Sequence, residues 1–143
     1  MGKSPTFTVK CSVAHNGLSI TTFDALIDMG ADAYILISQK FADKLTKHLK
    51  LDSKTDFPPG YVRPYKNIEP DIISQAMMAA LRVQGYKFLD QWMVVLPTMT
   101  KDMILEKMWL GENKVLPNCS NNQLIFPEGL LKAPLDKDIE VSK

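Results

Sequence analysis

The stretch 23–41 (FDALIDMGADAYILISQKF) limits the possible folds of this chain more than any other segment. It places Asp28 between two apolar runs, with Gly30 two residues further on. In a helix, Asp24, Asp28 and Asp32 would lie on one face and repel one another, and Gly30 would weaken the helix interior. The stretch therefore predicts a strand, a tight loop that carries Asp28, and a second strand.

A hairpin is predicted before this loop. Apolar and polar residues alternate over residues 7–13, which is typical of a half-buried strand. Asn16 and Gly17 follow, and both tolerate a positive φ, so the pair predicts a tight turn. Residues 18–27 should then return antiparallel to the first strand and deliver Asp28 to its loop.

A short strand and a helix are predicted after the loop. The apolar run 33–37 suits a buried strand, and Ser38 suits the N-cap of a helix that covers residues 39–49. Helical spacing would turn three apolar side chains of this helix toward a sheet: Phe41, Leu45 and Leu49.

The second half of the chain also has mainly strand patterns. Alternation predicts two strands around Gly85, and one face of the second would carry Phe88, Asp90, Trp92, Val94 and Leu96. Residues 101–105 and 123–126 predict further strands, and residues 107–113 predict a short helix. Together these patterns predict a mostly β, small closed barrel-like domain with one medium and one short helix. We expect an N-terminal extension (1–5), this domain (6–127), and a linker or disordered tail (128–143).

Composition narrows the possible partners. A chain of 143 residues with a formal charge of +1 suits one globular domain and gives no electrostatic basis for binding nucleic acid or an anionic membrane. No segment approaches the roughly 18 apolar residues of a membrane span. Cys11 and Cys119 lie far apart, and Asp24 and Asp32 lack further ligands at metal spacing. We expect an intracellular, cytoplasmic protein without a metal or cofactor.

Three patches of the chain resemble, in the same order, the retropepsin-like aspartic proteases, in particular those of gypsy-type LTR retrotransposon polyproteins. The first patch is 25–32 (ALIDMGAD), similar to the family's A-L-I-D-[ST]-G-A. The second is 102–105 (DMIL) followed by Trp109, Leu110 and Asn113, similar to D-I-I-L-G-x-x-W-L-x-x-x-N. The third is 121–126 (NNQLIF), similar to the family's closing N-x-x-L-x-F strand.

The resemblance implies an acid protease (retropepsin) fold in which Asp28 is catalytic. Met29, Gly30 and Ala31 would form the active-site loop around it. A flap over residues 60–73 would close on the substrate. The residues on the substrate and flap side would be Asp32, Gly60, Tyr61, Val62 and Arg63.

The resemblance also implies a partner. An aspartic protease needs two carboxylates that share one proton. Because the chain contains a single D-x-G sequence, the second Asp would come from another copy of the chain in a C2 homodimer. The substrate would be a peptide or polyprotein, held by strand-type hydrogen bonds.

Two residues depart from the family motifs. Met29 replaces a Thr or Ser whose hydroxyl bonds across the dimer axis, which removes a bond worth on the order of 1 kcal/mol per chain. Glu106 replaces a glycine and so adds a side chain and a carboxyl group close to the loop.

Three functions stay open: an active aspartic endopeptidase, a catalytically inactive domesticated retropepsin fold that dimerises or binds peptides, and a monomeric β-barrel unrelated to proteases.

Overall fold

The computed structural model describes residues 7–30, 32–55, 75–130, 132 and 137–139. The strands are β1 (Thr8–His15), β2 (Leu18–Asp28), β3 (Ile35–Ile37), β4 (Ala76–Val83), β5 (Tyr86–Val95), β6 (Met103–Glu106), β7 (Leu116–Asn118), β8 (Gln123–Ile125) and β9 (Lys137–Asp138). The helices are α1 (Gln39–Leu49) and α2 (Lys107–Glu112). The predicted flap residues Gly60, Tyr61, Val62 and Arg63 lie outside the described residues, as does the predicted N-terminal extension.

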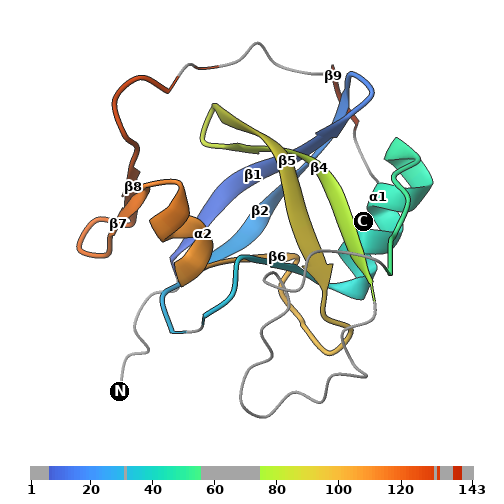
Figure 1. Cartoon of the computed structure of the whole chain (residues 1–143), viewed down its shortest axis with the longest axis horizontal. Helices are drawn as coiled ribbons and strands as arrows, with labels where there is room; N and C mark the ends of the chain where they lie inside the picture. Colours follow the sequence, from blue (N-terminus) through green and yellow to red (C-terminus); the bar gives the residue numbers. More distant parts are fainter. Residues whose placement is uncertain (1–6, 31, 56–74, 131, 133–136, 140–143) are drawn as a thin grey trace.

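The main sheet closes into a barrel. Its strand order is β1-β4-β5-β3-β6-β2-β9, and an additional pairing between β1 and β2 closes the ring (Figure 1). The β7–β8 hairpin forms a separate two-stranded sheet beside α2. The prediction of a mostly β, closed barrel with one medium and one short helix is confirmed.

The turn that leads into β2 has the predicted geometry. Asn16 and Gly17 have φ values of 54° and 77°, and β1 pairs antiparallel with β2 up to His15 and Leu18. Such a turn matches the twist of the two strands that it joins. This hairpin sets the direction in which β2 runs toward Asp28.

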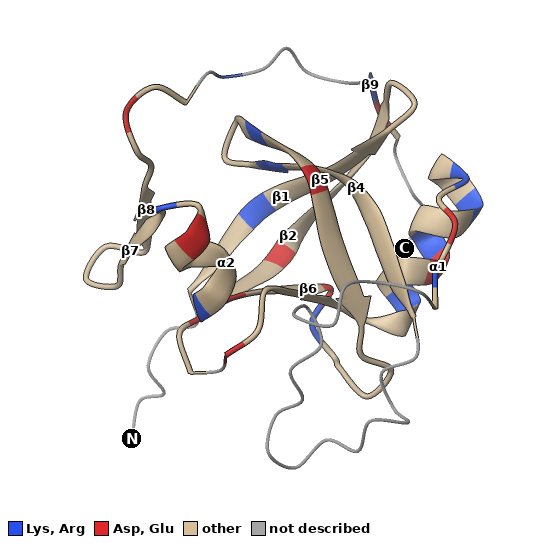
Figure 2. Cartoon of the chain, in the orientation of Figure 1, with Lys and Arg blue, Asp and Glu red and all other residues tan. Residues whose placement is uncertain are grey.

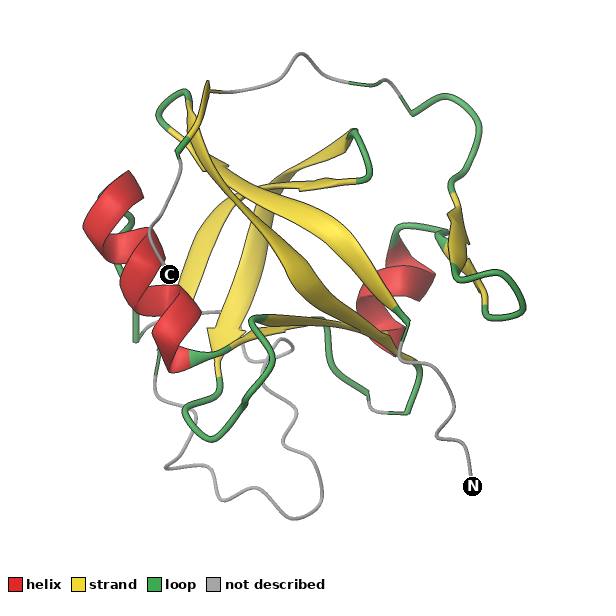
Figure 3. Ribbon diagram, turned by 180° about the vertical axis from the view of Figure 1, so that it is seen from behind, coloured by secondary structure: helices red, strands yellow, loops and turns green. Residues whose placement is uncertain are grey.

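Helix α1 covers one side of the barrel, and α2 lies on the opposite side (Figure 3). Phe41, Leu45 and Leu49 are buried against the barrel, as predicted, while Lys40 and Lys47 are exposed. Figure 2 marks the lysines of α1 in blue. Among the described residues, no helix has the length and apolar character required to cross a bilayer.

The N-terminus of α1 is capped by Ser38, as predicted. The Ser38 hydroxyl accepts a hydrogen bond of 3.0 Å from the Phe41 N–H. We expect Ser38→Ala to lower the free energy of unfolding by about 1 kcal/mol, because this buried N–H loses its acceptor. Urea unfolding followed by circular dichroism measures the loss, with Ser53→Ala, an exposed serine after the helix, as control. An equal effect of both variants would contradict the cap's role.

The prediction for the faces of β5 is wrong beyond Phe88. The β4–β5 register shifts between Ala79 and Leu81, and Asp90 on the opposite strand has a φ of 55°. This bulge adds a residue and so exchanges the two faces of the strand. Phe88, Met93 and Val95 therefore point into the main core. Val94 and Leu96 pack in a second, smaller apolar cluster with Leu36 and Ala76.

Part of the predicted tail contacts the barrel. In β9, Lys137 and Asp138 pair in parallel with Leu18 and Ser19 of β2. The Asp138 carboxylate accepts hydrogen bonds from the hydroxyls of Ser19 (3.1 Å) and Thr21 (2.8 Å). The division of the chain at residues 5 and 127 stays a prediction, but β9 shows that the segment after 127 is not wholly a free linker.

Candidate active site

Asp28 is the last residue of β2, and hydrogen bonds hold this end of the strand on both sides. On one side, β2 pairs in parallel with β6, and Asp28 stands in register with Glu106. On the other side, the Ile27 N–H donates to the Phe7 carbonyl at 2.8 Å. Ile27 itself is buried in the core. The position of Asp28 is therefore fixed by the barrel, whereas its side chain is half-buried and reaches solvent.

The turn after Asp28 depends on Gly30. The Gly30 N–H donates to Asp28 Oδ1 at 2.8 Å, so the carboxylate stabilises its own turn. A Cβ atom at position 30 would lie 3.0 Å from the same oxygen, which is too close for an unstrained contact. Glycine at this position therefore lets the backbone approach the carboxylate and orient it.

The far side of the loop returns to the start of α2. The Glu106 N–H donates to the Tyr34 carbonyl at 2.8 Å, and the Met108 N–H donates to the Ala33 carbonyl at 3.0 Å. Both ends of the loop are thus anchored to the β6–α2 junction. Of the predicted site residues on this loop, Met29, Gly30 and Asp32 are exposed around Asp28, and Ala31 is outside the described residues.

A polar cluster that the sequence did not predict joins β2 to β6. Thr22 Oγ1 donates to Asp102 Oδ2 at 2.7 Å and accepts from the Asp24 N–H at 2.9 Å. The Asp102 N–H donates to Asp24 Oδ2 at 3.2 Å, and Lys101 Nζ lies 3.2 Å from Asp24 Oδ1. Because its carboxylate makes these contacts, Asp24 serves to hold the start of β6. The only signal for this cluster in the sequence is Asp102, at the head of the second patch.

The described residues offer neither a metal site nor a reactive thiol at Cys11. No group of three or more His, Cys, Asp or Glu side chains among them could hold a metal ion. Cys11 is buried in the core, and burial raises the pKa of its thiol far above the usual range. Its thiol is therefore inert, and a cysteine nucleophile is not available there.

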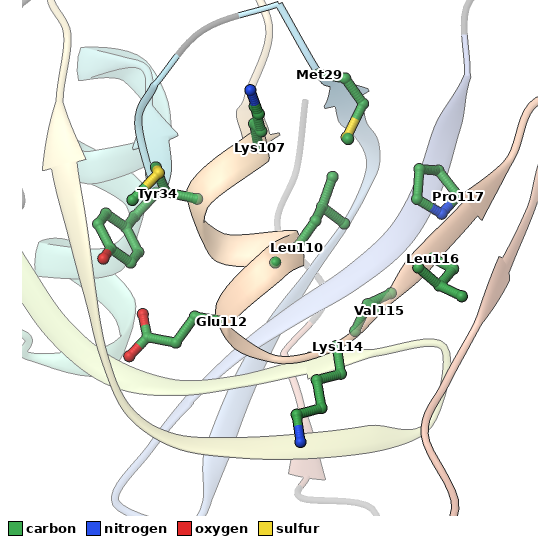
Figure 4. Close-up of a pocket in the computed structure, with 11 residues that line it drawn as sticks. Met29, Tyr34, Lys107, Leu110, Glu112, Lys114, Val115, Leu116 and Pro117 are labelled. Carbon is green, nitrogen blue, oxygen red and sulfur yellow. The ribbon is translucent and has the colours of Figure 1, made fainter.

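An apolar pocket of about 630 Å³ lies beside the Asp28 loop. We call it the loop–α2 pocket. Its apolar lining comprises Met29 and Tyr34 from the loop, Met108 and Leu110 from α2, and Val115, Leu116 and Pro117 from the following segment, with Gly111 and charged residues at Lys107, Glu112 and Lys114. Figure 4 shows Met29 and Leu110 projecting toward the same space. No sequence pattern indicated this pocket, because its walls come from three separate segments.

Comparison with known proteins supports the fold. No model of a known protein family matches the chain, and no curated protein matches its sequence. Among solved structures, the chain is similar to the retroviral protease-like domain of Ddi1 from Leishmania major, with a TM-score of 0.58 and 16% identity over 88% of this chain and 90% of that one. A retropepsin-like aspartic protease from Rickettsia conorii gives a TM-score of 0.49 and 19% identity over 82% of this chain and 79% of that one.

The chain thus has a retropepsin-like fold, with Asp28 on a glycine-supported loop at the end of a barrel strand. This agrees with the resemblance seen in the sequence patches. The gypsy-type retrotransposon origin is not tested by these similarities and stays a prediction.

Proposed function

We propose that the protein is an aspartic endopeptidase that acts as a C2 homodimer, with one Asp28 from each chain at the active site. One observation carries this proposal. Within a retropepsin-like barrel, the Asp28 carboxylate is held by the Gly30 N–H at 2.8 Å and is still accessible to solvent. A carboxylate that is oriented but accessible can bind a water molecule and a peptide carbonyl.

The chemistry needs two carboxylates with one proton between them. The ionised carboxylate removes a proton from a bound water, which attacks the scissile carbonyl carbon, and the protonated one gives its proton to the substrate. Collapse of the tetrahedral intermediate breaks the C–N bond once the amide nitrogen has been protonated. Glu106 is 0% exposed and therefore cannot reach a substrate as the second acid. The second carboxylate is assigned to Asp28 of a second copy.

The surface around the loop supports a second copy as the partner. Three residues that line the loop–α2 pocket are exposed: Met29 at 48%, Met108 at 40% and Leu116 at 61%. Leu116 pairs with Ile125 on β8, which is 53% exposed, so this apolar surface continues across the β7–β8 hairpin. Apolar side chains gathered in this way are typical of association surfaces. A partner placed here would lie next to Asp28.

We expect Met29→Lys to weaken self-association by about tenfold or more. The substitution removes apolar burial and places two like charges near the twofold axis. Sedimentation equilibrium measures the dimer dissociation constant. The matched control is Leu89→Lys, which changes another exposed apolar residue, on β5 and outside the loop–α2 pocket. Equal weakening by both variants, or a wild-type chain that stays monomeric at high concentration, would contradict the proposed dimer.

The substrate is proposed to be an extended peptide, such as a segment of a polyprotein. The test is cleavage of a mixed peptide library at about pH 5, where a shared proton is expected on the dyad, with and without a hydroxyl-containing transition-state mimic. Inhibitor-sensitive cleavage supports the endopeptidase. A dimer that binds peptides without cleaving them supports instead the inactive module, which the departures at Met29 and Glu106 favour.

A further inference from the structure

Glu106 and Asp28 project from neighbouring strands on the same side of the sheet. β2 and β6 run parallel, and their registered pairs are Ala25 with Met103, Leu26 with Ile104, Ile27 with Leu105, and Asp28 with Glu106. Registered residues of parallel strands share a face, and successive pairs alternate between the two faces. Ile27 and Leu105 lie in the main core, so the Asp28–Glu106 pair belongs to the opposite face.

The Glu106 side chain is enclosed at the junction that anchors the loop. It is 0% exposed, whereas Asp28 on the adjoining strand is half-buried. Glu106 is also the N-cap residue of α2, yet its side chain makes no capping hydrogen bond to the helix. Meanwhile its backbone N–H holds the Tyr34 carbonyl at the returning end of the loop. The side chain is therefore buried on the same face of the sheet as Asp28, at the neighbouring strand position, and does not cap the helix.

We propose that Glu106 is a positioning residue for the Asp28 loop. This inference rests on the proposed function for its effect on catalysis, but its structural part can be tested separately. The buried side chain occupies the space beside Asp28 between β6 and the loop, and so restricts the movement of the Asp28–Gly30 turn. A glycine, which the family motif has at this position, could not fill this space. The restriction would compensate for the hydroxyl that Met29 lacks.

Steady-state kinetics test the role in catalysis. We expect Glu106→Ala to lower kcat by about tenfold or more while KM changes by less than about threefold, because a displaced carboxylate slows the chemical step more than it weakens peptide binding. Glu106→Gln has nearly the same size and shape and keeps a polar end group, so it should fill the same space and restore most of kcat. The control Glu128→Gln changes an exposed glutamate after β8 and should leave both constants unchanged.

Amide hydrogen exchange tests the positioning without requiring activity. In Glu106→Ala, the Gly30 N–H, which bonds to Asp28 Oδ1, should exchange about tenfold or more faster, while the Val13 N–H in the barrel core stays protected. Should Glu106→Ala fail to fold, Glu106→Asp, which is shorter by one methylene group, gives the same comparison. An unchanged exchange rate of the Gly30 N–H in a folded variant overturns the proposal. A Glu106→Gln variant whose kcat falls as far as that of Glu106→Ala also overturns it. If the wild-type protein cleaves nothing, the proposed protease function fails, and the Gly30 exchange still decides the role of Glu106.

Discussion

Replacing Asp28 with asparagine is expected to abolish peptide cleavage, with a fall in kcat/KM of about 10³-fold or more. Asparagine has almost the same shape as aspartate, and its Oδ1 can still accept the Gly30 N–H that now lies 2.8 Å from Asp28 Oδ1. The loop should therefore keep its conformation. What the variant loses is the ability to ionise and to share a proton, and in a homodimer both carboxylates of the active site are lost together. Each tenfold loss corresponds to about 1.4 kcal/mol of transition-state stabilisation.

The measurement compares initial rates of wild type, Asp28→Asn and a control on one cleavable peptide. Asp52→Asn is a suitable control because Asp52 is exposed after α1 and lies outside the loop. Thermal unfolding and sedimentation of Asp28→Asn should match the wild type, which would show that only chemistry has been removed. Cleavage that persists in Asp28→Asn would refute the catalytic role of Asp28.

Local patterns were sufficient to predict most elements of this fold. Asn16 and Gly17 need a positive φ for their turn, and Ser38 has an oxygen at the distance that an N-cap requires. These signals depend on neighbouring residues, so they can be read directly from the sequence. The position of Asp28 followed in the same way, because the strand before it and Gly30 after it are both visible in the stretch 23–41.

Features that depend on distant contacts were not predictable. The bulge at Asp90 changes the faces of β5, and its position depends on the pairing of β5 with β4. β9 depends on contacts with residues more than a hundred positions earlier in the chain: Asp138 accepts from the hydroxyls of Ser19 and Thr21, and the Ile139 N–H donates to the Ser19 carbonyl. The departure of Glu106 from the family motif is visible in the sequence, but its complete burial on the same face as Asp28 depends on the fold and on the β2–β6 register.

Trp109 is expected to be the residue of α2 on which stability depends most. It is 1% exposed, its ring packs edge-on against Phe88 with 5.1 Å between ring centroids, and its Nε1–H donates to Gln91 Oε1 at 2.9 Å. Trp109→Ala would leave a large cavity and remove the donor from Gln91. We therefore expect a loss of about 3–5 kcal/mol in the free energy of unfolding. Urea denaturation at one fixed protein concentration measures the loss without a contribution from changes in dimerisation.

The destabilisation caused by Trp109→Ala should extend to the candidate active site, because α2 follows directly on β6 and the Met108 N–H of α2 anchors the loop at the Ala33 carbonyl. Exchange of the Gly30 N–H should therefore become faster in Trp109→Ala at temperatures well below global unfolding. Leu89→Ala, at an exposed position of β5, is the control and should change stability by no more than about 0.5 kcal/mol. A Trp109→Ala variant that loses less than about 1 kcal/mol would contradict the packing of α2 on the barrel. A Trp109→Ala variant with the expected loss of stability but an unchanged exchange rate of the Gly30 N–H would instead show that β6 alone holds the Asp28 loop.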